Sequence, residues 1–185
     1  SSKRAVVELS SLTVGSFSGL LRFTFVSGSS LVKVDSVIST QEDARAIVYD
    51  AGIGAVDPSW TETVWMDSTD LLTRSGAGSE LDASTQSVRF RTVLAEGEKG
   101  SVALFPPPHQ FFYPLDFADN FGFVWSGRGY RDLVDEVSLG VRQPLDGDRR
   151  YVPWFNAPPK SEQRLGVYWY LTPSKGGEAI SEVAR

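Results

Sequence analysis

The chain has 185 residues, no cysteine and a formal net charge of −5, which is enough sequence for one domain with a substantial core. Without cysteine it has no disulfide framework, no thiolate metal site and no cysteine nucleophile. The negative charge argues against nucleic acid as a partner, and no apolar run reaches the roughly 18–20 residues that a membrane-spanning helix needs.

Strands are predicted along most of the chain, because apolar and polar residues alternate with a period of two. Segments 20–26 and 31–38 flank a Gly/Ser turn and predict a hairpin. A second hairpin is predicted where the alternating segment 87–94 leads through the turn at 97–100 into an apolar run. We expect the core on these strands and on 164–171 to include Phe23, Phe25, Val34, Phe90, Val167 and Trp169.

The remaining strands are short and are separated by Gly and Pro, as in sandwiches and barrels. They are expected at 45–49, 121–125, 137–142, 151–155 and 164–171. The predicted fold is therefore all-β, a two-sheet antiparallel β-sandwich of a jelly-roll or supersandwich-like kind.

Two segments depart from this pattern. Residues 66–86 are rich in Gly, Ser and Asp and predict a long surface loop. Near the end of the chain Ala179, Ile180 and Val183 fall at helical spacing and predict a short helix. The expected division is a β-sandwich domain over 1–173 and a C-terminal helix over 174–185. That helix is either a tail packed on the sandwich or a linker into a further domain.

Aromatic residues are concentrated in the second half, where 15 of the 22 lie between Phe105 and Tyr170. Strand 164–171 carries tyrosines at Tyr168 and Tyr170, on the face opposite its core residues. Tyrosine suits half-wet surfaces because it combines an apolar body with a polar tip. This second face is either buried, covered by a partner domain or subunit, or used as a ligand platform.

A candidate binding site is predicted from two proline-stiffened segments, 105–116 and 149–156. They combine flat aromatic faces with arginine, amide and imidazole groups on a preorganised backbone, which is typical of sites for small ligands. For a saccharide ligand the predicted contacts are His109, Phe112, Tyr113, Arg149, Arg150, Tyr151, Trp154 and Asn156. The structural alternative is a crossover whose aromatic residues plug the end of the sandwich.

Familiar catalytic signatures are missing from the sequence. There is no nucleophile elbow, since Phe17 stands where the serine would be, and no phosphate loop or dinucleotide fingerprint. With one histidine and no cysteine, neither a metal site nor a cofactor is expected. A carboxylate pair for glycoside hydrolysis remains open among Asp116, Asp119, Asp132, Asp135 and Glu136.

The sequence pattern of several segments resembles that of a known group of domains. Segments 20–25, 32–34 and 46–52 look like the N-terminal β-sandwich domains that precede the catalytic domain in large bacterial carbohydrate-active hydrolases. The ending 164–171, followed by a helix, is similar to the exit from such a domain into its catalytic partner. The resemblance implies a sandwich that packs on a catalytic domain and contributes to the rim of its active site.

We therefore expect a non-catalytic accessory or carbohydrate-recognition module of a larger glycan-degrading hydrolase. One alternative is a self-sufficient carbohydrate-active enzyme that uses carboxylates within 105–136. Another is a structural protein that assembles through its aromatic face. The expected protein is soluble, either cytoplasmic or exported with its signal already removed.

Overall fold

The structure, a computed structural model, describes residues 3–54, 59–76, 84–107, 123–127, 136–142 and 154–185. In these ranges the chain forms antiparallel strands and one short helix near its C-terminal end, which confirms the all-β prediction. The elements in chain order are β1 (Arg4–Val14), β2 (Phe17–Val26), β3 (Leu31–Thr40), β4 (Ala46–Ile47), β5 (Asp50–Ile53), β6 (Trp60–Met66), β7 (Leu72–Gly76), β8 (Ser84–Ser87), β9 (Val93–Gly97), β10 (Gly100–Phe105), β11 (Phe123–Gly127), β12 (Ser138–Arg142), β13 (Phe155–Asn156), β14 (Gln163–Thr172) and α1 (Gly176–Val183).

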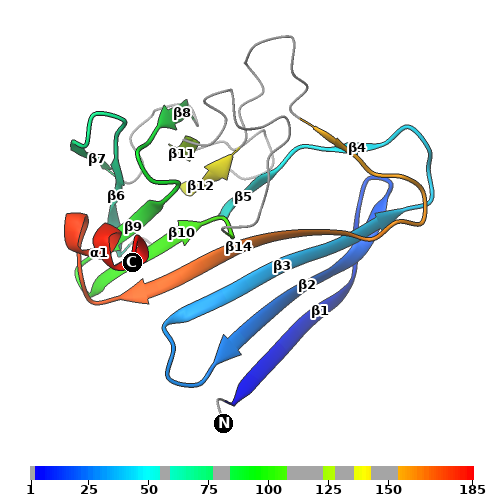
Figure 1. The fold of residues 1–185 in the computed structure, drawn as a ribbon, viewed down its shortest axis with the longest axis horizontal. Helices are drawn as coiled ribbons and strands as arrows, with labels where there is room; N and C mark the ends of the chain where they lie inside the picture. Colours follow the sequence, from blue (N-terminus) through cyan, green and yellow to red (C-terminus); the bar gives the residue numbers. More distant parts are fainter. Residues whose placement is uncertain (1–2, 55–58, 77–83, 108–122, 128–135, 143–153) are drawn as a thin grey trace.

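One large sheet dominates the molecule (Figure 1). Its eight strands follow the order β1-β2-β3-β14-β10-β9-β6-β7, and a four-stranded sheet has the order β5-β12-β11-β8. Strands β13 and β4 form a separate short pair. The large sheet therefore joins the two ends of the chain, because C-terminal β14 lies between β3 and β10.

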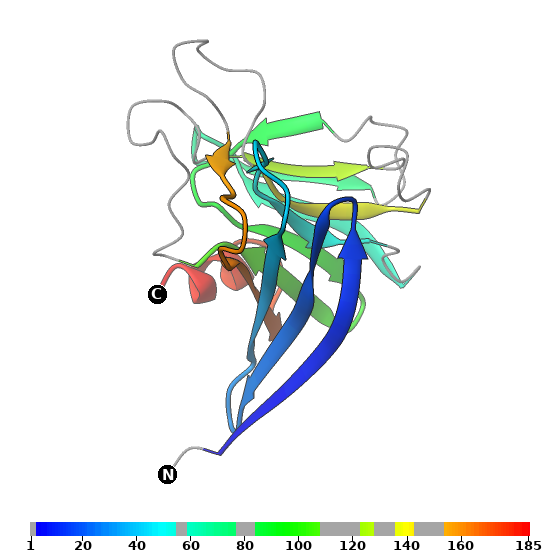
Figure 2. The same cartoon turned by 90° about the vertical axis from the view of Figure 1, so that its right-hand side faces the viewer.

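The two faces of the large sheet are covered by different elements (Figure 2). On the inner face, buried side chains of the two sheets form the main core, which includes Val93, Leu104, Val124, Leu139 and Val167. On the opposite face, the helix face, α1 packs its buried residues Ala179 and Ile180 against Val64, Leu94 and Ala103. The centre of the large sheet is thus buried on both sides.

Both predicted hairpins are present. Strands β2 and β3 pair in register from Phe17 opposite Thr40 to Phe25 opposite Val32. The second hairpin joins β9 to β10, but its first strand begins at Val93 rather than at 87. The chain bends over 89–91, before the strand starts.

Two segments of the chain differ from the sequence predictions. Segment 66–86 is not one long loop, because it contains β7, paired with β6, and β8, paired with β11. Cross-strand pairing therefore gives order to a polar sequence that lacks periodicity of its own. The N-terminal strand β1 was not predicted, and it pairs with β2 over nearly its whole length.

The predicted core is correct for some residues and wrong for others. Val34 and Val167 are buried, and Phe23 and Trp169 are partly buried against the main core. Phe25 is 41% exposed because β2 lies near an uncovered edge of the large sheet. Phe90 is 39% exposed because it lies in the bend before β9 rather than in a strand.

The tyrosine face of β14 is covered in part by the chain's own helix. Tyr170 packs against the cluster formed by α1, and Tyr168 lies against Phe105 with ring centroids 5.5 Å apart. On the tyrosine face of β14, Tyr170 therefore helps to pack α1 onto the sheet.

Candidate functional site

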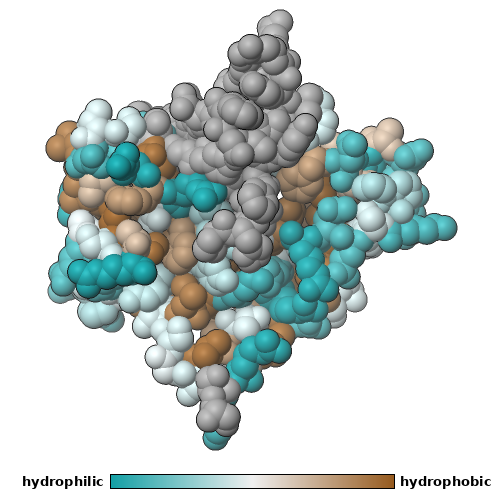
Figure 3. Space-filling model, viewed as in Figure 1, coloured by the Kyte–Doolittle hydropathy of each residue, from teal (hydrophilic) through white to brown (hydrophobic). Residues whose placement is uncertain are grey.

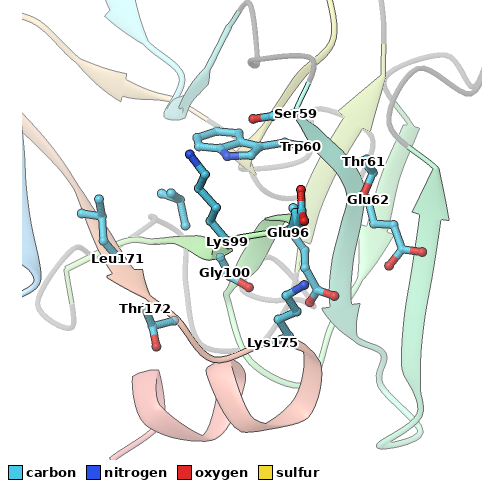
Figure 4. A pocket seen from close by; sticks show the side chains of 14 residues that line it. Ser59, Trp60, Thr61, Glu62, Glu96, Lys99, Gly100, Leu171, Thr172 and Lys175 are labelled. Atoms are coloured by element: carbon cyan, nitrogen blue, oxygen red, sulfur yellow. The ribbon is translucent and has the colours of Figure 1, made fainter.

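A hollow of about 790 Å³ opens at one end of the large sheet (Figure 4). It lies between the start of β6, the β9–β10 turn, the end of β14 and the start of α1. We call it the Trp60 hollow, and its lining residues are Ser59, Trp60, Thr61, Glu62, Glu96, Gly97, Glu98, Lys99, Gly100, Ser101, Val102, Leu171, Thr172 and Lys175.

Two glycines of the β9–β10 turn fix the shape of this hollow. A Cβ atom at Gly97 would lie 2.6 Å from the Ser59 carbonyl oxygen and 3.0 Å from Cδ1 of Trp60. Gly100 has a φ of +137°, and a Cβ there would lie 2.2 Å from the Thr172 carbonyl oxygen. Because only glycine permits these approaches, the turn is held against β6 and β14, with the Lys99 side chain extending toward the indole of Trp60 (Figure 4).

Glu96 holds the base of the hollow together. This buried carboxylate accepts a hydrogen bond from Arg74 Nη1 at 2.8 Å and one from the Gly176 backbone N–H at 2.7 Å. Arg74 also pairs with Glu62, and its hydrogen bonds to Glu96 and then Glu62 raise the pKa of the guanidinium. Glu96 thus ties the first turn of α1 to the sheet.

The next turn of α1 is tied to β14 by Glu182. Its carboxylate accepts hydrogen bonds from the hydroxyls of Thr172 and Ser174, each at 2.7 Å. The Ser174 hydroxyl first, and then that of Thr172, lowers the pKa of Glu182. The side of the hollow formed by β14 and α1 is therefore preorganised.

Three charged side chains around the Trp60 hollow are left available for a ligand. Glu98, Lys99 and Lys175 form no ion pair within the part of the chain that the structure describes. They line the same hollow as the partly buried Trp60 and the apolar side chains of Val102 and Leu171, with Lys99 on the side of the indole and Lys175 at the start of α1 (Figure 4). An aromatic surface with a few convergent polar groups is the usual make-up of a small-molecule site.

A second cavity, of about 510 Å³, lies between β2, β3, β14 and β5. It is mainly apolar, and Phe23 and Trp169 meet in it edge to face at 5.9 Å. The Tyr49 hydroxyl donates to the Gly166 carbonyl at 2.6 Å, and burial raises the pKa of that hydroxyl.

The carboxylate of Asp50, which also lines this second cavity, accepts from Trp125 Nε1 and Arg142 Nε, each at 2.9 Å. The polar groups of Tyr49 and Asp50 are therefore already engaged, which makes this cavity less suited to a polar ligand.

The predicted saccharide site is only partly within the described residues. Trp154 precedes β13 and is 43% exposed, and Asn156 is exposed in β13. The other predicted contacts lie outside the described residues, namely His109, Phe112, Tyr113, Arg149, Arg150 and Tyr151. The carboxylates Asp116, Asp119, Asp132 and Asp135 lie outside them as well, whereas Glu136 is described and exposed.

The Trp60 hollow contains none of the residues predicted from the sequence. Its parts come from four separate segments, and no local motif joins them. The signals available in advance were a tryptophan at the start of a strand and a charged turn bounded by Gly97 and Gly100. Leu171 follows the expected core residues Val167 and Trp169 on the same side of β14, but it is 47% exposed and lines the hollow.

The described residues contain neither a helix that could span a membrane nor a cluster of metal ligands. No helix among them has the length and apolar character needed to cross a membrane. In the same ranges, no group of three or more His, Cys, Asp or Glu side chains is arranged to hold a metal ion.

Comparison with known proteins shows a weak likeness to a solved structure. No protein-family model matches the chain, and no curated protein does. Among solved structures, the chain is similar to the galactose mutarotase related enzyme from Lactobacillus acidophilus, with a TM-score of 0.34 and 14% identity. The match covers 84% of this chain and 61% of that one, so the chain spans about three fifths of the length of that structure. At this TM-score the likeness carries no argument about function.

Proposed function

We propose that this domain is a non-catalytic carbohydrate-recognition module of a larger glycan-degrading hydrolase, and that the Trp60 hollow is its saccharide site. The observation that carries the proposal is a hollow lined by the Trp60 indole and by Glu98, Lys99 and Lys175, which have no ion pairs with other described residues. The catalytic domain of the hydrolase is the partner in this proposal.

A sugar ring fits this combination of groups. Its C–H face is apolar and stacks on an aromatic ring, while its hydroxyls need hydrogen-bonding partners around the edge. Trp60 supplies the ring, and the ammonium and carboxylate groups supply donors and acceptors. Because the hollow is built on strands and a glycine-tight turn, little conformational entropy is lost on binding.

The hydrogen bonds and ion pairs of the glutamates in the hollow favour carbohydrate recognition over glycoside hydrolysis. Glycoside hydrolysis uses two carboxyl groups that flank the bond. Glu96 uses both its oxygens to hold Arg74 and the start of α1, and Glu62 pairs with Arg74. That leaves Glu98 as the lining carboxylate with no ion pair to any described residue.

A second candidate surface surrounds Trp154. Trp154 is 43% exposed, and the exposed Asn156 is two residues away. In this variant of the proposal, Trp154 stacks on the sugar, and the remaining contacts are His109, Phe112, Tyr113, Arg149, Arg150, Tyr151 and Asn156. The two tryptophans are distant in sequence, with Trp60 at the start of β6 and Trp154 just before β13, so substitutions at each distinguish the two surfaces.

Calorimetric titration with a panel of neutral and acidic oligosaccharides tests both surfaces. We expect Trp60→Ala to weaken binding at least about tenfold, or roughly 1.4 kcal/mol, and Trp60→Phe to retain most of the affinity. Trp154→Ala is the matched control and should bind as the wild type does. The reverse result would move the site to Trp154, and a wild type that binds no glycan of the panel would contradict the proposal.

A further inference from the structure

Strand β1 is an unusually open sheet edge. All 11 of its residues are exposed, including Val6 at 44%, Val7 at 50% and Leu9 at 50%. The other edges of the two larger sheets are short, with five residues in β7 and four each in β5 and β8. Natural edge strands are usually short, charged, interrupted or covered, because an open edge pairs readily with another strand.

The backbone groups that β1 offers follow from its pairing with β2. The Ser27 N–H donates to the Lys3 carbonyl at 2.8 Å, so these two residues form a hydrogen-bonded pair. Arg4 lies opposite Val26 in the next pair along the strands. In an antiparallel ladder, hydrogen-bonded pairs alternate with non-hydrogen-bonded pairs. The backbone groups of Arg4, Val6 and Glu8 therefore point away from β2 toward solvent.

The charged residues of this edge would lie opposite residues of opposite charge in a second copy related by a twofold axis. Arg4 is exposed and forms no ion pair with the residues described in the structure. Glu8 is paired with Arg22 at 2.7 Å, and 42% of its side chain remains exposed. If Val6 lies opposite its own copy in an antiparallel pair, then Arg4 lies opposite Glu8 at both ends, and Val7 lies opposite Ala5.

We infer that a second copy of this chain pairs with β1, edge to edge and antiparallel, over Arg4–Glu8 with Val6 at the twofold axis. The register places the three outward-pointing residues of each copy in hydrogen-bonded pairs. The pairing ends at the bulge between Leu9 and Leu12, where Ser11 has a φ of +62°. Because the contact is isologous, it closes at two copies, and it does not depend on saccharide binding.

A charge exchange between two variants tests the register. Arg4→Glu and Glu8→Arg each place like charges opposite one another in the homodimer, so each should weaken self-association at least about tenfold in sedimentation velocity. An equimolar mixture should restore association, because the two variants complement each other across the interface. Thr13→Glu, which adds a carboxylate beyond the bulge, is the control and should associate as the wild type does.

Val6→Pro tests the backbone pairing. It removes an N–H that points to solvent, so an edge strand tolerates it, and the melting temperature in dilute solution should change little. Self-association should be lost. A wild type that stays monomeric into the high micromolar range, a Val6→Pro variant that still associates, or a mixture that fails to rescue the charge variants would each overturn the inference.

Discussion

The two halves of the large sheet differ in how many of their faces are covered by other elements. In the covered half, β6, β9 and β10 lie between the smaller sheet and α1, and Leu94, Ala103 and Leu104 have no exposed surface. In the uncovered half, every residue of β1 is exposed, and β2 has no fully buried residue. Figure 2 shows β1 and β2 extending beyond both covering layers.

The pattern of β1 and β2 nevertheless has an apolar and a polar side. On the inner face, Val7 continues the row that runs through Phe23 and Val34 to Val167, and Leu9 lies opposite Leu21 in a neighbouring row. Their helix face carries more polar residues, and Figure 3 shows mainly hydrophilic residues over these strands. Alternation therefore specifies which side of a strand is apolar, whereas burial of that side depends on a second layer.

The largest expected difference between the halves is in the cost of truncating leucine. Leu104 and Leu9 lie on the inner face of the same sheet, one fully buried and the other 50% exposed. Leu104→Ala should lower the free energy of unfolding by about 2–5 kcal/mol. Leu9→Ala should change it by about 0.5 kcal/mol. Denaturant unfolding at a concentration where the chain is monomeric measures both, and similar costs would contradict the comparison.

A smaller effect is expected from the link between the covered half and its helix. In Glu96→Gln, an amide donor group must face either Arg74 or the Gly176 N–H, so one hydrogen bond is lost. We expect a loss of about 1–3 kcal/mol in the free energy of unfolding, with faster hydrogen exchange in α1. Glu98→Gln is the matched control, because Glu98 is exposed in the turn. An equal effect of both substitutions would show that Glu96 does not anchor the helix.

Local pattern was sufficient to predict much of this fold. The strict alternation in β2, β3 and β14 predicted those strands, and the turn at 97–100 predicted the second hairpin. The helix was predicted from the spacing of Ala179 and Ile180, and these two residues contact the sheet. Strands β7 and β8 were missed, because their order comes from pairing with β6 and β11.

The candidate site was not predicted, for a related reason. Trp60, Lys99, Leu171 and Lys175 come together only because β14 crosses the sheet between β3 and β10 and α1 folds back onto the helix face. The exposed positions of Phe25 and β1 likewise depend on where the smaller sheet ends. Neither the site nor the uncovered half can be inferred from a local segment.

Backbone hydrogen exchange at two protein concentrations tests the comparison most directly. Amides of Leu94, Ala103 and Leu104 should exchange only through global unfolding at both concentrations. In dilute protein, the outward amides of Arg4, Val6 and Glu8 should exchange rapidly, and they should slow at high concentration as the second copy pairs with β1. Protection of those three amides in dilute protein that equals the protection in β10, or exchange that does not change with concentration, would contradict this account.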